Sequence, residues 1–146
     1  MKNLEVKSDQ CTYLHKNGKF FKIDDLYIQD IESYKVYYND IPFTGTWIHF
    51  QNNKLNIKKD VLDGTDNGNY TSFYQSTEDD RVFVTGKKIN GKKDGLWYIY
   101  YQNGQVRHEE LFDHNTSTGY CKIFDENGNL IKKGRLILSL NFINSF

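Results

Sequence analysis

The chain has no alanine, little proline and cysteine, and no excess of charge of either sign. Its 146 residues include one proline, Pro42, two cysteines, and 19 Lys+Arg against 19 Asp+Glu. Without alanine, the best helix former, a helical fold is disfavoured. Because the charges balance, the chain lacks the overall basic character of a general nucleic-acid binder, and we expect no nucleic-acid partner. Cys11 and Cys121 lie far apart, which predicts free thiols in a reducing compartment.

Long hydrophobic runs are also missing. Charged residues at Glu5, Lys7 and Asp9 interrupt the region where a secretory signal peptide would have its apolar core. The longest apolar run, Leu136 to Leu140, is far shorter than the ~20 residues that a membrane-spanning helix needs. We therefore expect a cytoplasmic protein with no membrane span.

Glycine and aromatic residues are abundant, with 11 Gly, 11 Tyr and 10 Phe, a composition that favours strands and tight turns. The segments GLWYIYYQNGQ, from Gly95, and GYCKIFDENGN, from Gly119, both begin with glycine, continue with an aromatic five residues later and contain Asn-Gly near their end. Weaker copies begin at Gly45 and Gly68, and TYLHKNGKFF around Gly18 matches the second half of another copy. About five repeat units are therefore present.

Each unit is predicted to be a β-hairpin, because Asn-Gly between alternating apolar residues is a strong hairpin signal. The predicted turn glycines, in type I′ turns, are Gly18, Gly104 and Gly128. A two-residue turn at Gly104 would pair Trp97 with Glu110 and Tyr100 with Arg107. The sequence predicts an all-β fold: about five antiparallel hairpins in one long twisted sheet.

Two columns of side chains follow from this register, on opposite faces of the strands. We predict that the fifth position after each glycine forms the structural core: Phe50, Phe73, Tyr100 and Phe124. The second position holds Trp47, Tyr70, Trp97 and Cys121, and its three aromatic residues are the candidate partner-binding surface. Alternatively, a bulge after the glycine would place both columns in one core.

We expect one domain over residues 1–146, with clear repeats at 39–134, a diverged first unit at 1–38 and an apolar C-terminal cap at 135–146. Residues 24–40 fit either two strands or an amphipathic helix, and aromatic and β-branched residues favour strands. Polar residues interrupt the pattern between Gly68 and Asp80, which leaves open whether the unit at 68–86 is a regular hairpin.

Three segments carry a resemblance to a known family: NDIPFTGTWIHFQNN (39–53), GKKDGLWYIYYQNGQVRHEELF (91–112) and TGYCKIFDENGNLIKKG (118–134). They resemble the bacterial variant of the MORN-type repeat, whose units run roughly G-x-W-x-x-[FY]-x-x-N-G-x-[LV]. This resemblance implies an elongated antiparallel sheet of successive hairpins. It also implies a protein-binding scaffold, since bacterial members are often labelled antitoxin or immunity components, which would neutralise a toxin by covering it.

No motif predicts catalysis, a cofactor or a metal. His108 and His114 do not have the spacing of a zinc-binding helix, because Phe112 occupies the position of the second ligand. The segment beginning at Asp63 lacks the ligands of a calcium loop, with Thr65 and Tyr74 at liganding positions. We therefore expect a protein that is not an enzyme.

One basic cluster, Lys87, Lys88, Lys92 and Lys93, could contact phosphate or anionic lipid. A phosphate-binding loop would be followed by a helix, whereas here a hairpin follows. Membrane-surface association through this cluster is the alternative to protein binding, and a purely structural oligomerisation repeat is a third hypothesis.

Overall fold

The computed structural model describes residues 10–23, 28–30, 35–38 and 40–135. These residues form thirteen β-strands and no helix, which confirms the all-β prediction. The strands are β1 Gln10–Lys16, β2 Lys19–Ile23, β3 Ile28–Asp30, β4 Lys35–Tyr38, β5 Ile41–Pro42, β6 Gly45–Gln51, β7 Lys54–Leu62, β8 Thr65–Phe73, β9 Val82–Ile89, β10 Lys92–Tyr100, β11 Val106–Asp113, β12 Thr116–Phe124 and β13 Leu130–Arg135. In this part of the chain no helix has the length and hydropathy to cross a membrane.

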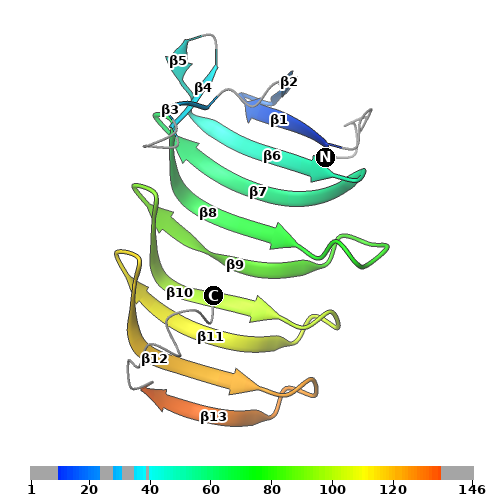
Figure 1. The fold of residues 1–146 in the computed structure, drawn as a ribbon, viewed down its shortest axis with the longest axis vertical. Helices are drawn as coiled ribbons and strands as arrows, with labels where there is room; N and C mark the ends of the chain where they lie inside the picture. Colours follow the sequence, from blue (N-terminus) through cyan, green and yellow to red (C-terminus); the bar gives the residue numbers. More distant parts are fainter. Residues whose placement is uncertain (1–9, 24–27, 31–34, 39, 136–146) are drawn as a thin grey trace.

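Ten strands form one open antiparallel sheet in the order β13-β12-β11-β10-β9-β8-β7-β6-β1-β2. From β6 onward, neighbours in the chain are neighbours in the sheet, so this part is a succession of hairpins. Figure 1 shows the bowed strands stacked along the long axis of the molecule, with β1 and β2 near one end and β13 at the other. Strands β3, β4 and β5 form a separate small sheet beside β6. The predicted long sheet of hairpins is confirmed.

Two-residue turns with positive φ at both positions connect most neighbouring strands. These turns are Asn17-Gly18, Asn52-Asn53, Asp63-Gly64, Asn90-Gly91 and His114-Asn115. Such φ values define type I′ turns, whose twist matches that of paired strands. Gly18 therefore has its predicted role. The last three turns join one predicted unit to the next, so the connections between units are as tight as the hairpins within them.

Gly104 and Gly128 have the predicted positive φ, 90° and 87°, but their turns are not type I′. The asparagine before each glycine does not have positive φ, and the Gly104 amide donates to the Tyr101 carbonyl. This is a type I turn followed by a left-handed glycine, which adds a bulge. As a result Tyr100 pairs with Val106, not with the predicted Arg107.

The glycines that open the repeats also lie in bulges. Strand pairing shifts register at Gly68, Gly95 and Gly119, all of which have positive φ. Each bulge comes before the second position of its unit, and the four residues from the second to the fifth position alternate regularly. The bulges therefore leave the two predicted columns on opposite faces and do not merge them into one core.

The two segments whose secondary structure the sequence did not decide, 24–40 and 68–86, contain strands in their described parts. In residues 24–40 the described parts are β3 and β4, and the others lie outside the described residues. The unit at 68–86 is a β8–β9 hairpin with a longer loop, in which Arg81 bonds Asp79 and the Gln102 carbonyl. The proposed C-terminal cap lies outside the described residues except for residue 135. Cys121 is a free thiol, and the side chain of Cys11 is not described.

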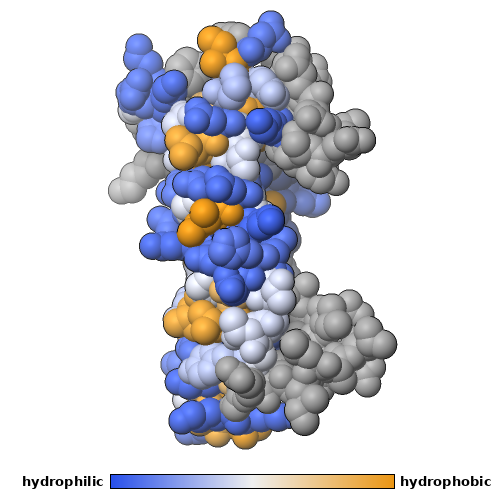
Figure 2. Space-filling view, turned by 90° about the vertical axis from the view of Figure 1, so that its left-hand side faces the viewer, coloured by the Kyte–Doolittle hydropathy of each residue, from blue (hydrophilic) through white to orange (hydrophobic). Residues whose placement is uncertain are grey.

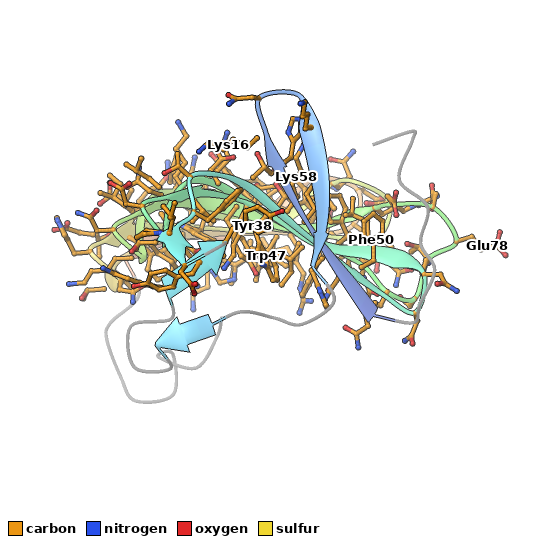
Figure 3. All side chains as sticks on the ribbon, turned by 90° about the horizontal axis from the view of Figure 1, so that it is seen from above. Lys16, Tyr38, Trp47, Phe50, Lys58 and Glu78 are labelled. Atoms are coloured by element: carbon orange, nitrogen blue, oxygen red, sulfur yellow. The ribbon has the colours of Figure 1, made fainter. Side chains whose placement is uncertain are left out.

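Two hydrophobic clusters lie on opposite faces of β6 and β7. One contains Ile48, Phe50 and Leu55, with Phe73 packed against them. The other contains Trp47 and Val61 from the large sheet, with Val36 and Phe43 from the segment that carries the small sheet. In Figure 3, Trp47 and Tyr38 point to one side of the ribbon and Lys58 to the other.

The predicted core column is only partly buried. Phe50 is buried, whereas Phe73, Tyr100 and Phe124 are half-buried. Among the described residues, these three side chains pack against lateral neighbours in the sheet, which leaves part of their surface exposed.

Candidate functional site: a basic aromatic groove

A continuous row of side chains crosses one face of the large sheet. Strand pairing places the following residues side by side: Trp47, Lys59, Tyr70, Trp97, Glu110 and Cys121. Gly86 lies in this row between Tyr70 and Trp97. We call this face the tryptophan face. It contains all four second-position residues, as the repeat register predicts.

Trp97 is the best-buried large side chain on this face, with 1% of its surface exposed. Its indole lies over Gly86, where a Cβ atom would come within 2.1 Å of the ring. The indole Nε1–H donates to the Lys87 carbonyl at 3.1 Å. The rings of Tyr70, at 5.5 Å, and Phe112, at 6.5 Å, lie on its flanks. The missing side chain of Gly86 thus provides the space that this tryptophan fills.

The prediction that Trp47 and Trp97 form an exposed surface is wrong. Only 9% of Trp47 is exposed, because Val36 and Phe43 cover it. Tyr70, the third predicted contact residue, is half-buried. The register placed these side chains on the correct face, but exposure depends on what neighbouring segments contribute, and the repeat pattern does not contain that information.

Lysine side chains lie along the aromatic row. The Lys59 ammonium is 4.7 Å from the Trp47 ring centroid, and the Lys88 ammonium is 4.8 Å from that of Tyr70. The Lys93 ammonium is 4.8 Å from the rings of both Trp97 and Phe112. Each aliphatic stem therefore shields apolar surface while the charge rests on an aromatic face.

Two carboxylates partly neutralise these lysines. Asp66 bridges Lys59, at 2.8 Å, and Lys88, at 3.2 Å. Glu110 is 2% exposed and accepts a hydrogen bond from the Ser117 hydroxyl. Burial raises the pKa of Glu110, although Ser117 and Lys93 act in the opposite direction. Burial, followed by repulsion from Lys88, lowers the pKa of Lys93, against the attraction of Glu110.

The predicted cluster of four lysines is divided between the two faces. Lys88 pairs directly with Lys93 on the tryptophan face, whereas Lys87 pairs with Asp94 on the opposite face. Lys92 pairs with Ile89, which alternation also places on the opposite face. The four lysines therefore do not share one face of the sheet. The reason is the Asn90-Gly91 turn, which folds the basic segment back on itself as two paired strands.

Lys88 and Lys93 border a groove of about 360 Å³ on the tryptophan face. The groove is lined by Tyr70, Ser72, Phe83, Val84, Lys88, Lys93, Trp97 and Ile99, and we call it the basic groove. It combines an apolar, aromatic floor with two ammonium groups from adjacent strands. Such a surface can bind a group that has an apolar part and a negative charge.

A second group of polar side chains lies at the β11–β12 turn. The ligand atoms of Asp94, Asp113 and His114 are within 4.8 Å of one another, and His114 bonds Asp113. Sequence spacing did not reveal this group because Asp94 belongs to the preceding strand. Hydrogen bonds between Lys93 and Asn115 bring the two segments together. We assign no metal site here, because the side chains of Asp113 and His114 are largely exposed and bonded to each other.

No protein-family model, curated protein sequence or solved structure matches the chain.

Proposed function

We propose that this chain is a non-catalytic module that binds another protein in the cytoplasm. The observation that carries the proposal is the basic groove, in which paired lysines border an aromatic floor on a rigid sheet. Strand pairing on both sides holds β8, β9 and β10 in place. A partner would therefore meet a surface that is already ordered, and little conformational entropy would be lost on binding.

We propose further that the partner is a toxin and that the chain is its antitoxin or immunity protein. This part of the proposal is supported by the resemblance of 39–53, 91–112 and 118–134 to bacterial MORN-type repeats. Neutralisation would come from covering a functional surface of the toxin. It would require no chemistry from the chain, no cofactor and no metal.

Binding to an anionic membrane is a weaker candidate. A planar surface would have to meet Lys87, Lys88, Lys92 and Lys93 together, but these lysines lie on two faces of the sheet. Figure 2 shows the side of the molecule on which the β7–β8, β9–β10 and β11–β12 turns lie. Its hydrophobic patches are separated by hydrophilic side chains and form no continuous apolar surface that could enter a membrane.

Co-expression with the protein encoded by the adjacent gene tests the proposal. We expect the two proteins to elute together in size-exclusion chromatography, and this chain to restore the growth of cells that produce the partner. Separate elution and unrelieved toxicity would contradict the toxin-neutralising role. Vesicles of phosphatidylcholine with and without phosphatidylserine provide the membrane control, and we expect no sedimentation with either at physiological salt.

A further inference from the structure

A polar hollow of about 420 Å³ spans strands β6 to β9 of the large sheet. Its lining includes six polar side chains on the face opposite the tryptophan face: Thr46, Lys58, Asp60, Asn69, Thr71 and Thr85. We call it the threonine pocket, and we propose that it binds one ring of a neutral sugar. This inference goes beyond the proposed protein-binding function, which uses the other face of the sheet.

Strand register brings the side chains of the pocket together. Lys58 pairs with Thr71, and Thr71 pairs with Thr85, so these three residues form one row across β7, β8 and β9. Figure 3 shows Lys58 on the side of the sheet away from Trp47. Tyr98 continues the row on β10, where it pairs with Thr85. Two short threonine side chains therefore lie between two long side chains, which leaves a hollow above the threonines.

The bulge between β7 and β8 positions a carboxylate in the pocket. Gly68 leaves space for Asp60, since a Cβ atom on this glycine would lie 2.8 Å from Asp60 Oδ2. The backbone N–H of Asn69 donates to the same oxygen at 2.9 Å. Among the described residues, no group donates a hydrogen bond to the other oxygen, Oδ1. The sheet therefore holds Asp60 in place and leaves one oxygen able to accept from a ligand.

Other polar groups of the pocket also lack a partner within the protein. In the part of the chain that the structure describes, the Lys58 ammonium, the Asn69 side-chain amide and the Thr71 hydroxyl form no hydrogen bond or salt bridge. The Thr85 hydroxyl differs, because it bonds with the Tyr100 hydroxyl at 3.0 Å. An ammonium group only donates, whereas a hydroxyl and an amide both donate and accept. The pocket thus presents several kinds of hydrogen-bonding group to one ligand.

The charges and the lining favour a neutral ligand with several hydroxyl groups. Lys58 and Asp60 carry one charge of each sign, so an anion or a cation would be repelled by one of them. An apolar ligand would remove the polar groups from water without replacing their hydrogen bonds. The neighbouring hydroxyls of a sugar both donate and accept, so they match the ammonium, the carboxylate and Thr71 together. The volume lies within the range of small-molecule sites.

The first experiment titrates the protein with the methyl glycosides of glucose, galactose, mannose and N-acetylglucosamine. The methyl resonances of Thr71 and Thr85 report on the pocket, and the indole N–H resonance of Trp97 reports on the other face. We expect at least one glycoside to shift the threonine methyls saturably and to leave the indole unchanged. The absence of a saturable shift with all these glycosides, or equal shifts on both faces, would overturn the inference. Tighter binding of glycine or inorganic phosphate than of every glycoside would overturn it too.

A linear trisaccharide of the sugar that binds best identifies the source of the ring. Binding at least as tight as that of the methyl glycoside would assign the pocket to one ring of a sugar chain. Weaker binding would assign it to a free sugar, because the neighbouring rings would then collide with the rim of the pocket.

Matched variants test the residues of the pocket. Thr71→Val removes a hydroxyl from a side chain of nearly the same shape, and it should weaken binding of the best glycoside at least tenfold. Thr71→Ser retains the hydroxyl and should bind within threefold of the wild type. Lys58→Met should also weaken binding at least tenfold. Thr116→Val and Lys133→Met make the same changes at exposed positions outside the pocket and should alter the affinity less than twofold. Equal losses inside and outside the pocket, or a loss in Thr71→Ser as large as that in Thr71→Val, would overturn the inference.

Discussion

Trp47 and Trp97 occupy the same position in two repeats, yet different parts of the structure bury them. Trp47 is covered from outside the sheet by Val36 and Phe43. Trp97 packs on its own sheet, over Gly86 and between Tyr70 and Phe112. Among the described residues, a second layer therefore covers one indole, whereas the neighbours of the other belong to its own sheet.

The comparison shows two ways in which the described part of the sheet buries an indole. Gly86 on the neighbouring strand leaves space for the Trp97 ring. Aromatic and lysine side chains pack around the ring. The lysine charges remain near solvent while their stems cover apolar surface. The same packing positions the ammonium groups of Lys88 and Lys93 at the basic groove. Packing and the proposed binding site therefore share the same residues.

The largest effect should come from Trp97→Ala. We expect a loss of about 3–5 kcal/mol in the free energy of unfolding, because paired strands on both sides prevent the space over Gly86 from collapsing. Urea denaturation measures the loss. A change below about 1 kcal/mol would show that lateral packing does not support this region.

Phe43→Ala should separate the two tryptophans. We expect a loss of about 3 kcal/mol, because the side chain is buried against Trp47. The emission of Trp47, measured in a Trp97→Phe background, should shift to longer wavelength and become accessible to acrylamide. The emission of Trp97, measured in a Trp47→Phe background, should not change. If both emissions shifted, the two sites would not be independent.

Gly86→Ala tests the packing of Trp97 on Gly86 with a smaller change than Trp97→Ala. The added methyl group would overlap the Trp97 ring, and we expect a loss of about 1–3 kcal/mol from the displaced indole. Gly104→Ala is the control, since nothing lies within 4 Å of its position and only its positive φ opposes the change. It should cost about 1 kcal/mol or less. The reverse order of the two losses would be inconsistent with the packing of Trp97 on Gly86.

Glu110→Gln should have the smallest effect, and the effect should depend on pH. Because the folded-state pKa of Glu110 is raised, folding favours its protonated form. The wild type should therefore lose stability as pH rises from the ordinary glutamate pKa, about 4.3, to the raised value. The Gln variant lacks this loss, so its stability relative to wild type should increase over that range. Parallel curves of unfolding free energy against pH would refute the effect of burial on Glu110.

Much of the local structure could be predicted from the sequence because its causes are local. Asn-Gly pairs marked three of the turns, and the repeat register correctly paired Trp97 with Glu110. The pairing of Tyr100 was wrong by one residue, because Asn-Gly is compatible both with a type I′ turn and with a type I turn followed by a bulge. The turn at His114-Asn115 was not predicted, since it lies between the units that the repeat defines.

The sequence by itself determined the all-β class, the succession of hairpins and the two alternating columns, because turn preference and the two-residue period act over a few residues. Only the tertiary structure decided which side chains are buried and which charges meet. Gly86 makes room for Trp97 from the preceding strand, and Asp66 joins Lys59 to Lys88 across three strands. These outcomes depend on contacts between strands, whose bulges shift the pairing by amounts that the residues of a single strand do not specify.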